Sequence, residues 1–295
     1  MRLPDPYLPL LDFRRAALPR REVWRVVLVW IGFEASFALA PLVVMPLVDP
    51  DWSDALQEVL VYAGFGIDLI VLLVLVRLLH GRGLRSLIGP RGPFRRDLLR
   101  SLIAVGLVLL VQQPFTLWPD LPDLTLADPA RWLGWLAPAV LAIALQVTTE
   151  EVYFRGYLQQ QMAALDLRRR AWLVFPSIYF GLSHLLNGAG LAEGTLWAIW
   201  AGMLGAACAD LTARTGNLGA AIGLHLGNNL FAALVLGSVG WPGYGLALFL
   251  LPEGSFVENT DGLDALLSPL TAVDLLFSAM GVLVMWLAAR IAIRA

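Results

Sequence analysis

Two adjacent glutamates open the part of the sequence that carries chemistry. Residues 149–155 read Thr-Glu-Glu-Val-Tyr-Phe-Arg. On an α-helix, side chains four positions apart lie on one face, so Glu151 can pair with Arg155, whereas Glu150 points about 100° away. Pairing neutralises Glu151 and leaves Glu150 available as a general base. Removal from water raises the pKa of a carboxyl group, which favours this role. The alternative is that these three residues only hold helices together through buried polar contacts.

Two later segments each place a pair of side chains one helical turn apart. Phe180 precedes His184 by four residues, and His225 precedes Asn229 by four. A lone histidine in a membrane helix commonly bonds a neighbouring helix and does no chemistry. An imidazole and a carboxamide on one face can, however, donate hydrogen bonds to a developing oxyanion, as in acyl transfer. Neither pair is specific by itself.

The composition requires a membrane setting for these groups. Of the 295 residues, 58% are hydrophobic and 15% charged, and the mean hydropathy is +0.71. Apolar runs long enough to cross ~30 Å of hydrocarbon indicate about eight spans. They cover residues 23–47, 57–79, 101–118, 132–154, 171–187, 195–212, 217–237 and 270–289. We therefore predict an all-α, polytopic transmembrane bundle forming one domain over residues 1–295, and a helix that reaches the cytoplasmic surface at residues 159–161.

Arginine placement predicts the orientation. The sequence has no lysine, and all arginines except Arg131 and Arg155 fall in alternate connections or in the terminal segments. Because basic residues are retained in the cytoplasm, both termini are expected there. The Lys-free composition favours a bacterial source and hence the inner (cell) membrane. Such clusters beside spans are topology signals, so we expect no nucleic-acid partner, and the single Cys208 excludes an internal disulfide. Asp210 and Arg214, four apart, are expected to pair.

Taken together, the motifs resemble a known family. Glu-Glu-x-x-x-Arg, Phe-x-x-x-His and His-x-x-x-Asn, in this order, are similar to those of the CAAX-protease and bacteriocin-processing family of intramembrane proteases, which includes Rce1-type prenyl-protein endopeptidases. The resemblance covers a core at residues 132–237 and includes the approach at residues 214–218. It implies that Glu150 activates water with help from His184, and that His225 and Asn229 form the oxyanion site. Glu151, Arg155 and Phe180 complete the predicted site.

The chemistry leaves several alternatives open. Zinc could bind Glu150, His184 and His225, but the His-Glu-x-x-His pattern is absent, and we favour a mechanism that needs no cofactor. The expected partners are membrane lipid and a membrane-associated or lipid-anchored protein or peptide, cleaved inside the membrane at a site reached from the cytoplasm. Prenylated substrates need not exist in a bacterial cell. A catalytically silent immunity or membrane-organising scaffold is the second hypothesis, and a proton-coupled transporter is the third.

Overall fold

The computed structural model describes residues 5–49, 51–117, 123–188, 190–240, 243–253 and 266–294, and the fold is all-α. The long helices are α2 (Val23–Val44), α3 (Asp54–His80), α5 (Arg91–Leu117), α6 (Pro129–Glu151), α9 (Leu191–Thr215), α10 (Gly219–Leu234) and α11 (Pro269–Ile293). The short helices are α1 (Leu8–Phe13), α4 (Leu84–Ile88), α7 (Gln160–Leu165) and α8 (Phe175–Leu182). Single turns of 3₁₀-helix occupy Asp5–Tyr7, Met45–Leu47, Leu185–Asn187 and Tyr244–Leu246, and a longer 3₁₀ segment occupies Arg14–Arg20. Strands β1 (Thr125–Leu126), β2 (Leu236–Ser238) and β3 (Phe249–Leu251) form a small sheet in the order β1-β3-β2.

Five helices in the described part of the chain are long and apolar enough to cross a membrane. They are Val23–Leu47, Asp54–His80, Pro129–Leu165, Leu191–Thr215 and Pro269–Ile293. The other three expected runs correspond to shorter or more polar elements. Helix α5 begins with a charged segment, α8 has 8 residues after a π-helical turn, and α10 has 16. The finding is thus an all-α fold with five candidate spans, while the count of about eight stays a prediction.

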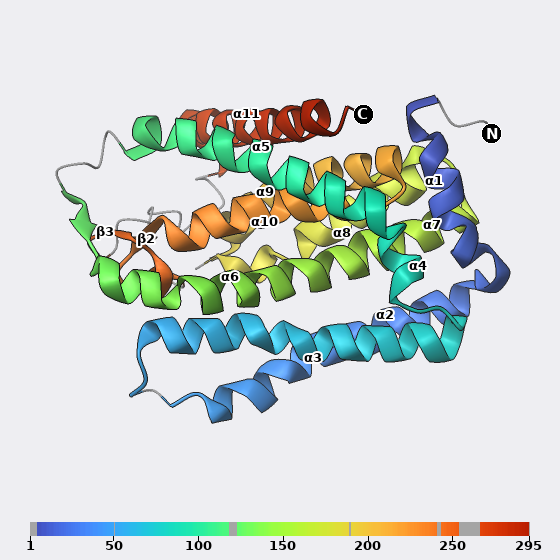
Figure 1. Cartoon of the computed structure of the whole chain (residues 1–295), viewed down its shortest axis with the longest axis horizontal. Helices are drawn as coiled ribbons and strands as arrows, with labels where there is room; N and C mark the ends of the chain where they lie inside the picture. The colour runs from blue at the N-terminus through green and yellow to red at the C-terminus, as the bar shows by residue number, and fades with distance from the viewer. Residues whose placement is uncertain are drawn as a thin grey trace.

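The helices lie roughly parallel and pack in layers (Figure 1). Helices α2 and α3 pack together on one side, α5 and α11 pack together on the other, and α6, α8, α9 and α10 lie between them. Both chain termini lie at one end with α1, α4 and α7, which we call the arginine end. The three strands lie at the opposite end, which we call the sheet end.

The fourth expected span is one continuous helical rod with a change of pitch. Helix α6 passes into a π-helical segment, Val152–Gln159, and then into α7. A π-turn changes the angle between successive side chains and is frequent at functional sites. A Cβ at Gly156 would lie 2.9 Å from the carbonyl oxygen of Leu87, so the missing side chain lets α4 pack directly against the π-helical segment.

The glutamines at the end of this segment and directly after it are buried within the protein. Gln159, Gln160 and Gln161 are each 0% exposed. Gln159 Nε2 donates to the carbonyl of Ala209 at 2.8 Å, and Gln160 Nε2 donates to that of Ser86 at 3.0 Å. Gln161 Nε2 lies 3.1 Å from the His80 ring. Tertiary contacts replace water at the amide nitrogens of these side chains.

Candidate functional site

The two adjacent glutamates have different surroundings, as predicted. The Glu151 side chain is 0% exposed, and its Oε1 lies 2.7 Å from Nη1 of Arg155, which is 1% exposed. The Glu150 side chain is 14% exposed and lines a cavity of about 920 Å³. The predicted Glu151–Arg155 pair is therefore confirmed. Of the two adjacent glutamates, Glu150 is the one that faces the cavity.

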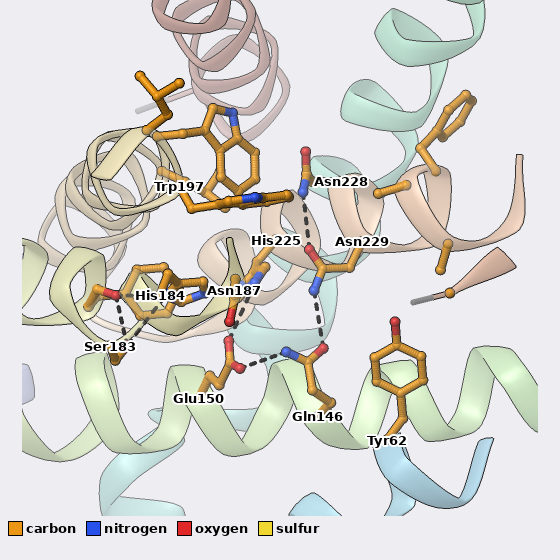
Figure 2. Close-up of a pocket in the computed structure, with 18 of the residues that line it drawn as sticks. Tyr62, Gln146, Glu150, Ser183, His184, Asn187, Trp197, His225, Asn228 and Asn229 are labelled. Atoms are coloured by element: carbon orange, nitrogen blue, oxygen red, sulfur yellow. Dashed lines mark hydrogen bonds and ion pairs between the residues drawn. The ribbon is translucent and has the colours of Figure 1, made fainter. Parts of the chain in front are cut away.

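His225 joins the two carboxylates. From α10, its Nδ1 lies 2.8 Å from Glu151 Oε1, and its Nε2 lies 3.6 Å from Glu150 Oε2. The residue is 3% exposed. The ring is thus held by the neutralised Glu151. Its other ring nitrogen is directed toward Glu150, which lines the cavity (Figure 2).

Phe180 packs at the centre of the motif residues. The Arg155 guanidinium carbon lies 4.4 Å from the ring centroid of Phe180, a cation–π contact. The ring centroids of His184 and His225 lie 4.6 and 5.7 Å from it. A Cβ at Gly205 would lie 3.0 Å from Arg155 Nη2 and 3.1 Å from Phe180 Cδ1, so α9 makes room for this contact. The supporting position expected of Phe180 agrees with this packing.

His184 lies just beyond the end of α8 and lines the same cavity. Its Nδ1 is 2.7 Å from the carbonyl oxygen of Phe180. Because a carbonyl only accepts, Nδ1 carries the proton of the neutral ring and Nε2 has the lone pair. Glu150 lines this cavity as well. His184 therefore has the tautomer needed to accept a proton beside Glu150.

A chain of three side-chain amides leads to Glu150, and sequence reasoning missed two of its members. Asn228 Nδ2 donates to Asn229 Oδ1 at 3.1 Å, and Asn229 Nδ2 donates to Gln146 Oε1 at 3.1 Å. Gln146 Nε2 then donates to Glu150 Oε1 at 2.6 Å (Figure 2). An ionised carboxylate only accepts, so Glu150 fixes the direction of the whole chain. The missed signal was the helical spacing, because Gln146 precedes Glu150 by four residues.

The predicted oxyanion pair is engaged by other groups. His225 faces the two carboxylates and Asn229 donates to Gln146. Both residues line the cavity. Their convergence on one oxyanion therefore stays a prediction.

The described wall of the cavity lies mainly toward the sheet end. It runs from Glu150 past Ala232 of α10 to Leu236 and Gly237 of β2, at the sheet end. No described residue between 155 and 179, nor any of the described part of the N-terminal arm before Val23, lines it. Buried side chains of the π-helical segment and α7 lie between the cavity and the arginine end, and the expected access from the cytoplasm stays a prediction.

The arrangement of the expected zinc ligands does not fit a three-ligand site. In the described part of the chain, no three His, Cys, Asp or Glu side chains are gathered closely enough to hold a metal ion. His225 Nδ1 is directed to Glu151, and His184 Nδ1 to a backbone carbonyl. Zinc held by Glu150, His184 and His225 stays the alternative to the expected mechanism without a cofactor.

The fold and the site define a helical membrane protein with a polar centre on a large cavity. Residues 132–231 match the family described as type II CAAX prenyl endopeptidase Rce1-like. This part of the chain is an Rce1-like type II CAAX prenyl endopeptidase family domain, which confirms the resemblance inferred from the motifs.

A bacterial protein is also similar. The "Uncharacterized protein YyaK" of Bacillus subtilis (strain 168) is 27% identical over 168 residues. The match covers 55% of this chain and 55% of that protein, so the chain spans about half the length of this curated relative. No solved structure matches the chain.

Proposed function

We propose that this protein is an intramembrane endopeptidase that hydrolyses a peptide bond of a membrane-associated or lipid-anchored protein or peptide. The observation that carries the proposal is the division of labour between the two glutamates. Glu151 is neutralised by Arg155 and fully buried, whereas Glu150 faces the cavity beside two imidazoles. Membership of residues 132–231 in an Rce1-like family supports the same reaction class.

In the proposed first step, Glu150 removes a proton from a water molecule in the cavity. The hydroxide oxygen attacks the carbonyl carbon of the scissile peptide, whose π electrons move to the carbonyl oxygen. Nε2 of His184 holds the lone pair of the neutral ring. It orients the same water molecule by accepting a hydrogen bond from the second O–H group of that water. The proton held by Glu150 is then delivered to the leaving amide nitrogen, and the C–N bond breaks.

The proposed oxyanion site uses the pair predicted from the sequence. The Asn229 amide has two N–H groups, and one of them is used by Gln146. The second can donate to the tetrahedral oxyanion, together with the His225 ring when Nε2 is protonated. Movement of Nε2 away from Glu150 Oε2, which is 3.6 Å away, would bring this donor to the substrate.

We also propose that α5, α8 and α10 lie within the membrane with the five candidate spans, which gives about eight spans and cytoplasmic termini. Because residues 132–231 belong to one family domain and a bacterial relative exists, we assign the protein to a bacterial cell membrane. Reporter fusions after α3 and after α11 test this topology. Both are expected to report the cytoplasm.

The test of function compares membranes from cells that carry the wild type or Glu150→Gln. Peptides with new termini should appear only with the wild type, and Glu22→Gln, at an exposed glutamate of the arginine end, should behave as wild type. The protease proposal fails if the two membrane proteomes are identical and the Glu150→Gln variant also returns a deletion strain to the wild-type phenotype. The protein is then a scaffold.

A further inference from the structure

The cavity is asymmetric along the length of the molecule. Its polar floor contains Glu150 and His225, with Gln146 and Phe154 also in the lining, and most of its remaining wall comes from the halves of the helices that lie toward the sheet end. Helix α3 contributes Tyr62 and Phe65 from its first half, and α11 contributes Asp274, close to its start. The wall continues to β2 and to Gly243, next to the sheet.

The opposite side of the floor is packed shut. Glu151, Tyr157 and Gln159 are each 0% exposed, and the N-terminal arm closes over α7 there. Arg14 Nη1 donates to the carbonyl of Ala163 at 2.8 Å, and Arg21 Nη1 donates to that of Ala164 at 3.2 Å. These bonds supply donors to carbonyls at the C-terminal end of α7, where the backbone carbonyls have no N–H partner within the helix. The arginine end therefore offers no water-filled route through its described residues to Glu150.

We propose that substrate enters the cavity from the sheet end, the end opposite both termini. This inference rests on the proposed function, which identifies the cavity as the place of hydrolysis. With the arginine end in the cytoplasm, the scissile bond is presented in the outer half of the bilayer or at its outer surface. The substrate class is then an exported or membrane-anchored peptide whose cleavable segment lies outside the cytoplasm, with apolar parts for the aromatic wall around Trp197 and Trp200.

Cysteine labelling tests the direction of entry without any need for activity. The only native thiol, Cys208, is buried, so a Cys208→Ala chain supplies the background. Asn187→Cys and Ala232→Cys place a thiol at exposed positions of the cavity wall. Ala130→Cys, exposed at the start of α6, marks the sheet end, and Ala16→Cys, exposed in the arm, marks the arginine end.

Each variant is treated with a membrane-impermeant sulfonated maleimide, in whole spheroplasts and in inverted vesicles. We expect Asn187→Cys and Ala232→Cys to be labelled in the preparation that labels Ala130→Cys. We expect neither to be labelled in the preparation that labels Ala16→Cys. Labelling together with Ala16→Cys overturns the proposal. So does failure of both cavity thiols to react with this reagent while a membrane-permeant maleimide modifies them, because no aqueous entrance then exists.

The cavity thiols are compared with marker thiols at the two ends of the same protein. The test of which end the cavity opens to is therefore valid for either orientation of the protein in the membrane. A failure of hydrolysis leaves the labelling pattern unchanged, and a reversed labelling pattern leaves hydrolysis intact. The two proposals therefore fail separately. A folding defect is recognised because Ala130→Cys and Ala16→Cys then lose their opposite sidedness.

Discussion

Glu150 and Glu151 differ by one position in the chain and by their whole electrostatic environment. Glu151 has a guanidinium and an imidazole within 2.8 Å, and both partners are almost completely buried. Glu150 has an amide donor on one oxygen and the cavity beside it. Replacing either glutamate by glutamine should stop hydrolysis, but for different reasons.

Stability separates these reasons. Glu151→Gln leaves the Arg155 guanidinium buried without its ion-pair partner, and such a loss costs about 3–5 kcal/mol. Glu150→Gln removes a charge from a partly exposed side chain on the cavity wall and should change stability far less. Thermal unfolding of the two purified variants in detergent measures the difference. An equal decrease in melting temperature would contradict the assigned roles.

Gln146 is a positioning residue for the proposed base. Gln146→Leu removes a hydrogen bond to a charged group, worth about 1.5–3 kcal/mol, so kcat should fall about 10- to 150-fold. KM should change little, because the lost bond holds Glu150 and not the substrate. The measurement uses the substrate that the Glu150→Gln comparison identifies.

The control for this variant lies in the same amide chain. Asn228→Leu removes the donor farthest from Glu150 and leaves the Gln146–Glu150 bond in place. Its kcat should therefore decrease less than that of Gln146→Leu. A change in KM alone at Gln146 would mean that this side chain binds substrate and does not position the base.

At the scale of elements, glycines set how closely α8 approaches α9. A Cβ at Gly181 would collide with the carbonyl oxygen of Ala198, and a Cβ at Gly205 would meet Phe180 and Arg155. Small residues at helix crossings in membranes permit such contact between backbones. This contact places Phe180 against Arg155, and His184, one turn later, against the Phe180 ring.

Gly181→Ala should therefore force the two helices apart. Overpacking of this kind costs about 1–3 kcal/mol, and the shift of His184 should lower kcat as well. Gly134→Ala is the matched control, because a Cβ there meets nothing within 4 Å. Thermal unfolding and initial rates of both variants test the expectation. Equal behaviour of the two variants would show that α8–α9 contact does not limit activity.

At the scale of the whole molecule, one aspartate joins the N-terminal arm to the bundle. Asp210 accepts a hydrogen bond from Tyr7 Oη at 2.6 Å, from Arg214 Nε at 2.6 Å and from Trp286 Nε1 at 2.9 Å. The pair with Arg214 confirms the sequence prediction, and the other two partners link the arm and α11 to α9. Burial and the Asp210 hydrogen bond raise the pKa of the Tyr7 hydroxyl, so it stays a donor at neutral pH.

Asp210→Asn should loosen the arm. The substitution keeps the shape of the side chain but removes the charge that holds Tyr7 and Arg214, so the arm should open locally more often. Limited trypsin digestion should then cut after Arg14 and Arg15 faster than in the wild type. Asp12→Asn, which removes an exposed ion pair with Arg15, should leave the rate unchanged. Equal rates for both variants would contradict the role of Asp210.

The sequence by itself determined the membrane class, the motif residues and two ion pairs. These follow from local rules: apolar runs must match the bilayer thickness, and side chains four apart share a helix face. The pairs of Glu151 with Arg155 and of Asp210 with Arg214 are both of this kind. The family resemblance needed only the order and spacing of the same residues.

Only the tertiary structure decided how separate helices meet around Glu150. The position of His225 between two carboxylates, the amide chain through Gln146 and the burial of residues 159–161 all depend on contacts between segments distant in sequence. The side of the molecule toward which the cavity wall extends also depends on such contacts. Spacing along one helix fixes which side chains share a face, but the packing of neighbouring helices decides whether that face meets protein, lipid or water.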